Sequence, residues 1–166
     1  VLTPGVGKIG IIPGHICRAG RIGVVSRSGT LSYESAVQTA ELGQSTIIGI
    51  GGDPVNGTNF VDALELFLDD ADTDGIVLIG EIGGTAEIEG AEFIKSWSTN
   101  IKKPVAAFVA GAAAPKGRKL GHAGAIVNSG AETADAKKEA LRSAGVEVSD
   151  TITKIGEAMR KAMGVK

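Results

Sequence analysis

Short apolar runs alternate with amphipathic stretches along the whole chain, and this alternation constrains the fold more than any other feature. The apolar runs are rich in Val, Ile and Ala, and they predict strands over residues 21–26, 45–50, 75–79, 104–109 and 146–148. Continuous apolar runs of this length are typical of parallel strands that are covered on both faces.

The stretches between these runs have the spacing of amphipathic helices, and they predict helices over residues 30–42, 59–68, 86–97, 134–144 and 152–163. Thr151 is expected to cap the last helix, and residues 10–13 are a candidate edge strand. Strand–helix alternation at this spacing predicts a single α/β domain over residues 1–166. Its sheet is expected to be doubly wound, mostly parallel and flavodoxin-like, with right-handed crossovers.

Composition and charge exclude several classes of function. The 166 residues carry a net charge of −2, which gives no electrostatic footprint for nucleic acid. No apolar run approaches the ~20 residues that span a membrane. Cys17 is the only cysteine and there are two histidines, so no metal site is expected. Because the chain starts at Val1 and not at a methionine, we expect a fragment or a processed product.

One of the two histidines, His122, stands between small residues in the segment Gly121-His122-Ala123-Gly124-Ala125. Its ring is therefore open to a ligand, and nothing nearby along the chain would bury it as core. A histidine placed this way is a candidate nucleophile or proton carrier. The alternative is a loop histidine beside glycines that serve backbone geometry alone.

Ligands of a doubly wound sheet bind beyond the carboxyl ends of its strands, and the first predicted strand ends in a polar turn. This turn contains Ser26, Ser28, Gly29 and Thr30. Amides at the start of the following helix, helped by the hydroxyls of Ser28 and Thr30, could hold a phosphate. A simple helix N-cap explains the same residues without a ligand.

Two further motifs follow predicted strands. The glycines of residues 49–54 permit close approach of the backbone to a bound group, although Asp53 and Asn59 are better explained as caps. Glu81 leaves the most apolar strand, where a carboxylate needs a partner. Since Glu81 and His122 both follow strands, we expect them to share one edge of the sheet, where the carboxylate would orient the histidine and stabilise its imidazolium.

Six short motifs occur in a fixed order along the chain. They are Pro13-Gly14-His15-Ile16, Ser26-Arg27-Ser28-Gly29-Thr30, Gly49-Ile50-Gly51-Gly52-Asp53-Pro54, Gly80-Glu81-Ile82-Gly83-Gly84, Ala114-Pro115-Lys116-Gly117 and Gly121-His122-Ala123-Gly124-Ala125. Together they resemble the C-terminal ligase domain of the α subunit of succinyl-CoA synthetase (succinate–CoA ligase). The resemblance runs from about Pro4 to the end of the chain. ATP-citrate lyase and ADP-forming acyl-CoA synthetases share this domain.

The resemblance implies a role for each matching residue. His122 matches the phosphohistidine, which carries a phosphoryl group from an acyl phosphate to a nucleoside diphosphate, and Glu81 matches its acidic partner. Tyr33 matches a position at the acyl substrate. Phosphate contacts are implied in two turns, by Ser26, Ser28, Gly29 and Thr30 and by Gly121, Ala123 and Gly124.

The resemblance also implies the reaction and its participants. Succinyl-CoA, phosphate and a nucleoside diphosphate are converted into succinate, CoA and ATP or GTP, with no tightly bound cofactor. The family's CoA-binding domain is missing from this chain, and its β subunit holds the nucleotide and Mg²⁺. We therefore expect the chain to be inactive alone and inclined to self-associate, in the cytoplasm of a prokaryote or the mitochondrial matrix of a eukaryote. The rival interpretation is a non-catalytic module that binds phosphate or a partner.

A few residues are explained without chemistry. His15 is expected to be structural or at an interface, and Phe93 and Trp97 to be packing residues. Lys116, Arg118 and Lys119 are better explained as a solvated loop face than as a phosphate site. Residues 96–101 are expected to lengthen a surface loop.

Overall fold

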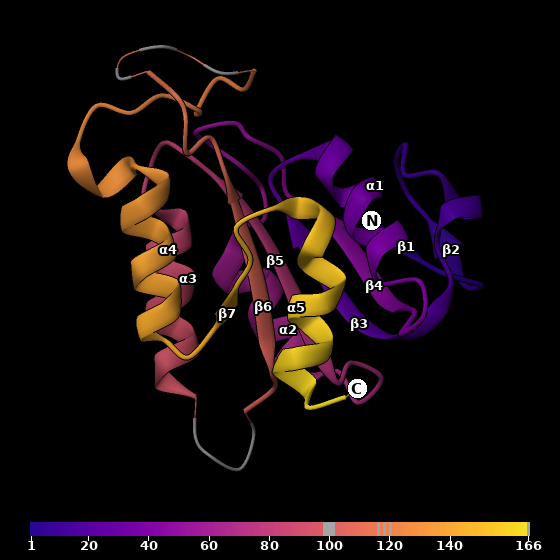
Figure 1. The fold of residues 1–166 in the computed structure, drawn as a ribbon. Coiled ribbons are helices and arrows are strands. Elements are labelled where there is room, and N and C mark those ends of the chain that lie inside the picture. Colours follow the sequence, from indigo (N-terminus) through magenta and orange to yellow (C-terminus); the bar gives the residue numbers. More distant parts are fainter. Residues whose placement is uncertain (98–101, 116, 118, 120, 166) are drawn as a thin grey trace.

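The computed structural model describes residues 1–97, 102–115, 117, 119 and 121–165, and within them seven strands form one sheet in the order β2-β1-β4-β3-β5-β6-β7 (Figure 1). The strands are β1 (Leu2–Thr3), β2 (Gly7–Lys8), β3 (Ala19–Ser26), β4 (Gln44–Gly49), β5 (Gly75–Glu81), β6 (Val105–Ala110) and β7 (Glu147–Val148). Neighbouring strands from β4 to β7 are parallel. In chain order these five follow the flavodoxin-like sequence 2-1-3-4-5, so the predicted sheet is confirmed.

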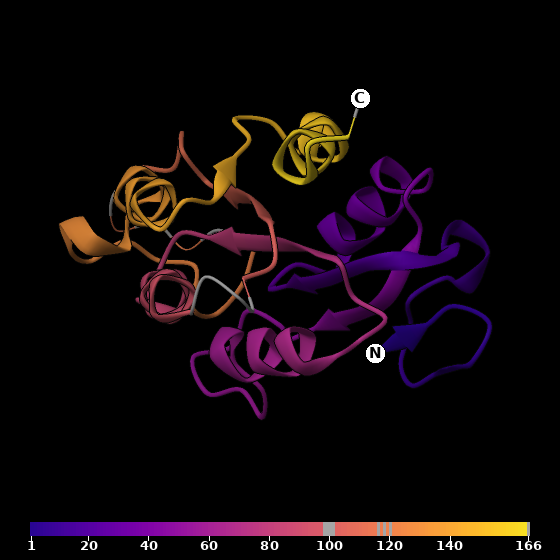
Figure 2. The same cartoon turned by 90° about the horizontal axis from the view of Figure 1, so that it is seen from below.

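Helices cover both faces of the sheet (Figure 2). α1 (Gly29–Gln38) and α5 (Ile155–Met163) lie on one face, and α2 (Phe60–Asp69), α3 (Ala86–Ser96) and α4 (Ala134–Ser143) lie on the other. Side chains of β5 alternate between the two cores: Ile76 packs toward α2 and α3, whereas Val77 packs toward α1 and α5, and both are fully buried. This two-sided burial explains why the strands are continuously apolar.

The first predicted helix ends four residues early, and the last begins three residues late. After α1 the chain turns back through Gly43, whose φ is +67°, and a Cβ atom at Gly20 would lie 2.2 Å from the Leu42 carbonyl oxygen. The backbone at Leu42 and Gly43 approaches Gly20 this closely because the chain turns after α1 and because Gly20 has no side chain. The last predicted helix starts as a 3-10 turn, η3 (Ile152–Lys154), and Thr151 makes no side-chain cap bond to it. Every other predicted boundary lies within two residues of the observed one.

The predicted edge strand over residues 10–13 is wrong. The sheet is extended instead by the antiparallel hairpin of β1 and β2, in which Leu2 pairs with Lys8 and also with Ile47 of β4. Two-residue strands are too short to show alternation, and Pro13 lacks the amide that a strand would use. Two further 3-10 turns, η1 (Gly14–Ile16) and η2 (Gly130–Glu132), complete the described elements.

Several smaller expectations have mixed outcomes. Phe93 and Trp97 pack edge to face with ring centroids 6.0 Å apart, as expected, and His15 is exposed in η1. Of the lengthened loop 96–101, residues 98–101 lie outside the described residues, and so do Lys116 and Arg118 of the basic cluster. Within the described part of the chain, no helix has the length and apolarity that crossing a membrane requires.

Candidate active site

The site lies at the carboxyl edge of the sheet, where β3 and β5 end side by side. Ser26 at the end of β3 pairs with Ile79 of β5, and Glu81 is the last residue of β5. The helix after β3 lies on one face of the sheet and the helix after β5 lies on the other (Figure 2). Two neighbouring strands whose chains leave to opposite faces form the crevice in which doubly wound sheets bind ligands.

Glu81 and His122 meet at this edge, as expected from their positions after strands. The His122 Nδ1 atom lies 2.7 Å from Oε2 and 2.9 Å from Oε1 of Glu81. Glu81 is buried, whereas 36% of the His122 side chain is exposed. An ionised carboxylate can only accept hydrogen bonds, so Nδ1 carries the proton and Nε2 keeps its lone pair in the neutral ring.

The loop that carries His122 is seated on two glycines from other loops. A Cβ atom at Gly52 would lie 2.3 Å from Nδ1 of His122, and one at Gly83 would lie 1.9 Å from the carbonyl oxygen of Gly124. The Gly124 amide also donates to the Gly52 carbonyl at 3.0 Å. The close approach expected of the 49–54 glycines is therefore made to the histidine loop itself.

Behind Glu81 lies a row of buried charges that sequence reasoning missed. The Arg27 Nε atom lies 3.4 Å from Oε1 of Glu81, and its Nη1 donates to Oε1 of Glu87 at 3.1 Å. Lys137 donates from Nζ to Oε2 of Glu87 at 2.5 Å. Glu87 and Lys137 are fully buried, and Arg27 is only 7% exposed. One signal was available: Lys137 lies between Ala134 and Leu141 on the buried face of α4.

Burial and charge act in opposite directions on two of these groups. Burial raises the pKa of Glu81, while the Arg27 guanidinium and the hydrogen bond from His122 lower it. Burial likewise lowers the pKa of Lys137, while the Glu87 carboxylate raises it. Burial is the larger effect in both cases, so the pKa of Glu81 is raised overall and that of Lys137 is lowered overall, and the ion pairs offset only part of the cost of desolvation.

The polar turn after β3 divides into buried and exposed parts. Ser26 is fully buried, and its hydroxyl donates to the Ser28 carbonyl at 2.8 Å, so it shapes the turn. Ser28 accepts from the Leu31 amide at 3.3 Å, which is the N-cap alternative. Gly29 and Thr30 are exposed in the first turn of α1. These two positions remain the accessible part of the predicted phosphate site.

Tyr33 does not line the cavity beside the histidine loop. It is half-buried on α1 and lines an open groove with Pro13, Ile16 and Ile152. Its role at an acyl substrate stays a prediction. The predicted cap role of Asn59 is confirmed, because its side chain accepts from the Asp62 amide at 3.0 Å and forms a capping box.

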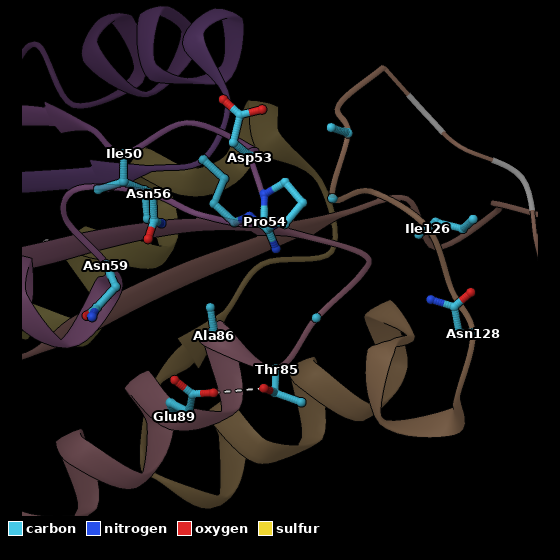
Figure 3. Close-up of a pocket in the computed structure, with 14 residues that line it drawn as sticks. Ile50, Asp53, Pro54, Asn56, Asn59, Thr85, Ala86, Glu89, Ile126 and Asn128 are labelled. Carbon is cyan, nitrogen blue, oxygen red and sulfur yellow. Dashed lines mark hydrogen bonds between the residues drawn. The ribbon is translucent and has the colours of Figure 1, made fainter.

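A cavity of about 520 Å³ opens beside the histidine loop (Figure 3). Ala123, Gly124 and Arg27 are among its lining residues. Polar and apolar side chains line the rest, among them Asn56, Asn59 and Ile50. The Thr85 hydroxyl donates to Glu89 at 2.7 Å at the start of α3, and a dashed line marks this bond in Figure 3. Asp53 lines this cavity too. Nowhere in the described ranges do three or more His, Cys, Asp or Glu side chains gather as metal ligands would.

Comparisons with known proteins agree with this architecture. The family model described as CoA-ligase matches residues 25–147. The α subunit of succinate–CoA ligase [ADP-forming] from Methanothermobacter thermautotrophicus is 54% identical over 168 residues, which take in 100% of this chain and 56% of that protein. The corresponding Aquifex aeolicus subunit is 53% identical over 99% of this chain and 54% of its own length. The chain thus spans just over half the length of these relatives.

Among solved structures, ATP citrate lyase from Methanothrix soehngenii in complex with citrate and coenzyme A superposes with a TM-score of 0.88. It is 31% identical, and the match covers 98% of this chain and 28% of that one. The resemblance read from the six motifs is therefore confirmed: the chain belongs to the CoA-ligase family.

Proposed function

We propose that this CoA-ligase domain carries the phosphohistidine step of a succinate–CoA ligase. The observation that carries the proposal is the contact between Nδ1 of His122 and the buried Glu81 carboxylate, which leaves Nε2 as the nucleophilic atom. A module that only binds phosphate needs neither a nucleophile nor a buried carboxylate that orients it.

In the proposed step, Nε2 of His122 attacks the phosphorus of succinyl phosphate. An N–P bond forms while the bond from phosphorus to the acyl oxygen breaks, and succinate leaves as a carboxylate. The proton on Nδ1 stays in place, so the phosphorylated ring gains positive charge next to Glu81. The carboxylate offsets that charge without moving a proton. Transfer of the phosphoryl group to a nucleoside diphosphate reverses these changes.

Two backbone regions would hold the phosphate oxygens. Amides at Gly29 and Thr30 open the first turn of α1, where the helix dipole favours an anion. Gly121, Ala123 and Gly124 supply backbone around the histidine itself. Backbone amides suit this task because they stabilise negative charge without titrating.

The remaining substrates and partners follow from the relatives. Because those relatives are named α subunits of an ADP-forming succinate–CoA ligase, we infer a β subunit as partner and ADP as the phosphoryl acceptor. CoA would be held with the help of a CoA-binding domain, and the nucleotide with Mg²⁺ by the β subunit. The chain alone is expected to have no ligase turnover. Citrate is the competing acyl substrate, since the superposed lyase binds it, and comparing succinate with citrate in the assembled enzyme decides between them.

Two matched histidine variants test the proposal. The chain is mixed with the β subunit and radiolabelled ATP, as wild type, His122→Asn or His15→Asn. We expect an acid-labile label on the wild type and on His15→Asn, because His15 is exposed in η1 and lies more than 100 residues before His122 in the sequence. His122→Asn should carry none. A label retained by His122→Asn, or no label on the wild type, would contradict the proposal.

A further inference from the structure

We propose that Arg27, Glu87 and Lys137 are positioning residues, which form a buried chain of alternating charge that fixes Glu81 and, through it, the tautomer of His122. This inference rests on the proposed function of His122. The three residues come from separate elements: the turn after β3, the first turn of α3, and α4. Glu87 and Lys137 are fully buried, whereas Arg27 also lines the cavity beside the histidine loop.

These residues contact the backbone amide, the backbone carbonyl and the carboxylate of Glu81. The Glu81 amide donates to Oε1 of Glu87 at 3.0 Å, and its carbonyl oxygen accepts from Nζ of Lys137 at 2.8 Å. Its carboxylate lies 3.4 Å from Nε of Arg27. Both the backbone and the side chain of Glu81 are therefore fixed, which is the condition for holding an imidazole in one orientation.

Both oxygens of the Glu87 carboxylate also have partners. Oε1 of Glu87 accepts from the Glu81 amide and from Nη1 of Arg27, and Oε2 accepts from Lys137. The carbonyl oxygen of Gly83, in the turn after β5, accepts from both Arg27 at 3.0 Å and Lys137 at 2.6 Å. The same cations thus pin the turn on which the histidine loop rests.

The charges balance when His122 is neutral. Lys137 and Arg27 supply two positive charges, and Glu87 and Glu81 supply two negative ones. Lysine is almost never fully buried unless it is paired, yet Lys137 has no exposed surface. A buried ion pair is weak evidence for stability, because apolar residues of similar volume often serve as well. The presence of four paired charges beside the site therefore favours a role in orientation.

Gly80 leaves the space that the Glu87 side chain occupies beside β5. A Cβ atom at Gly80 would lie 2.5 Å from Cγ of Glu87. Glycine at this position in β5 therefore lets the Glu87 carboxylate come up against the backbone of the next residue, Glu81. The arrangement depends on backbone space as well as on charge.

The test separates positioning from stability by removing one charge or two. Lys137→Met removes one of the two cations that pair with Glu87 and leaves one negative charge in excess among the buried side chains, so this single variant should melt at a lower temperature. Lys137→Met combined with Glu87→Leu removes both charges and should melt closer to the wild type. Ring ¹⁵N resonances of His122, measured by NMR on the unphosphorylated chain, report which nitrogen carries the proton.

In the double variant we expect the melting temperature to recover, whereas the tautomer of His122 should not return to that of the wild type. The population with the proton on Nδ1 should fall, and phosphorylation in the complex with the β subunit should slow by roughly tenfold or more, because the nucleophile is misplaced. Lys138→Met is the matched control, since Lys138 is also buried on α4 but pairs with Asp150. In Lys138→Met, the tautomer of His122 should match that of the wild type.

Wild-type tautomer and phosphorylation rate in the double variant would overturn the inference and leave a merely structural ion pair. If the double variant does not fold, Arg27→Lys decides the question, because an ammonium keeps the charge but lacks the planar fork that bridges Glu81 and Glu87. An unchanged tautomer in Arg27→Lys would equally overturn it. The NMR readout needs no phosphoryl transfer, so a failure of the proposed function is distinguished from a failure of this inference.

Discussion

Gly52→Ala should disable His122 without removing a charge or a hydrogen-bonding side chain. The new Cβ atom would lie 2.3 Å from Nδ1 and 2.4 Å from Cγ of the imidazole, whereas ordinary contacts begin near 3.4 Å. The ring must therefore retreat by about 1 Å, and its hydrogen bonds to Glu81 are then stretched or lost. A displacement of about 1 Å at a reacting group can cost about 10²-fold in rate, or about 2.7 kcal/mol in the barrier.

The assay is the rate at which the chain becomes phosphorylated in its complex with the β subunit, followed beside the melting temperature. Gly52 has no positive φ, so alanine fits its backbone and the fold should persist. Gly57→Ala, in the same loop, adds its methyl group to open space and serves as control. Equal phosphorylation rates in Gly52→Ala and Gly57→Ala would refute the claim that His122 depends on this seat.

Three other perturbations have defined outcomes. Glu81→Gln should lower phosphohistidine formation by about 10²-fold or more while affecting the melting temperature much less. Burial raises the pKa of Glu81 above its ordinary 4.5. Between the ordinary and the raised pKa, the folded protein therefore binds a proton at Glu81 and the unfolded protein does not. The wild type accordingly loses stability as the pH rises through the raised pKa. Gln does not titrate, so Glu81→Gln should lose less stability over the same window in thermal melts. Ser28→Ala removes the cap that accepts from the Leu31 amide and should lower the free energy of unfolding by about 1 kcal/mol in urea titrations. Val6 and Ile11 are each 84% exposed, so sedimentation should show concentration-dependent self-association that their replacement by Ser abolishes.

The fold could be predicted because its parallel strands are buried on both faces. Side chains on β5 alternate between two cores, so an uninterrupted apolar run was required, and the sequence contains one. The β1–β2 hairpin could not be predicted in this way. Its strands have two residues each, and the pairing of Leu2 with Ile47 joins segments that no local pattern connects.

Glu81 and His122 could be predicted as neighbours because both follow strands of a parallel sheet, and such ends share one edge. The buried charges of Arg27, Glu87 and Lys137 behind them could not be predicted. Glu87 looks like an ordinary acid in the first turn of a helix, and Lys137 looks like one of several charges on α4. Glu87 lies 60 residues from Arg27 in the sequence, and Lys137 lies 56 residues from Glu81 and 50 from Glu87, so only tertiary structure brings these residues together.

Phosphorylation of His122 at Nε2 is the central claim, and NMR of the phosphorylated, ¹⁵N-labelled chain tests it most directly. Coupling between ³¹P and a ring nitrogen identifies the modified atom, and mass spectrometry of the peptide that contains the modification identifies the residue. We predict a single phosphohistidine at position 122 with phosphorus on Nε2 and a proton on Nδ1, because Nδ1 lies 2.7 Å from the Glu81 carboxylate. Phosphorus on Nδ1, or on any residue other than His122, would contradict it.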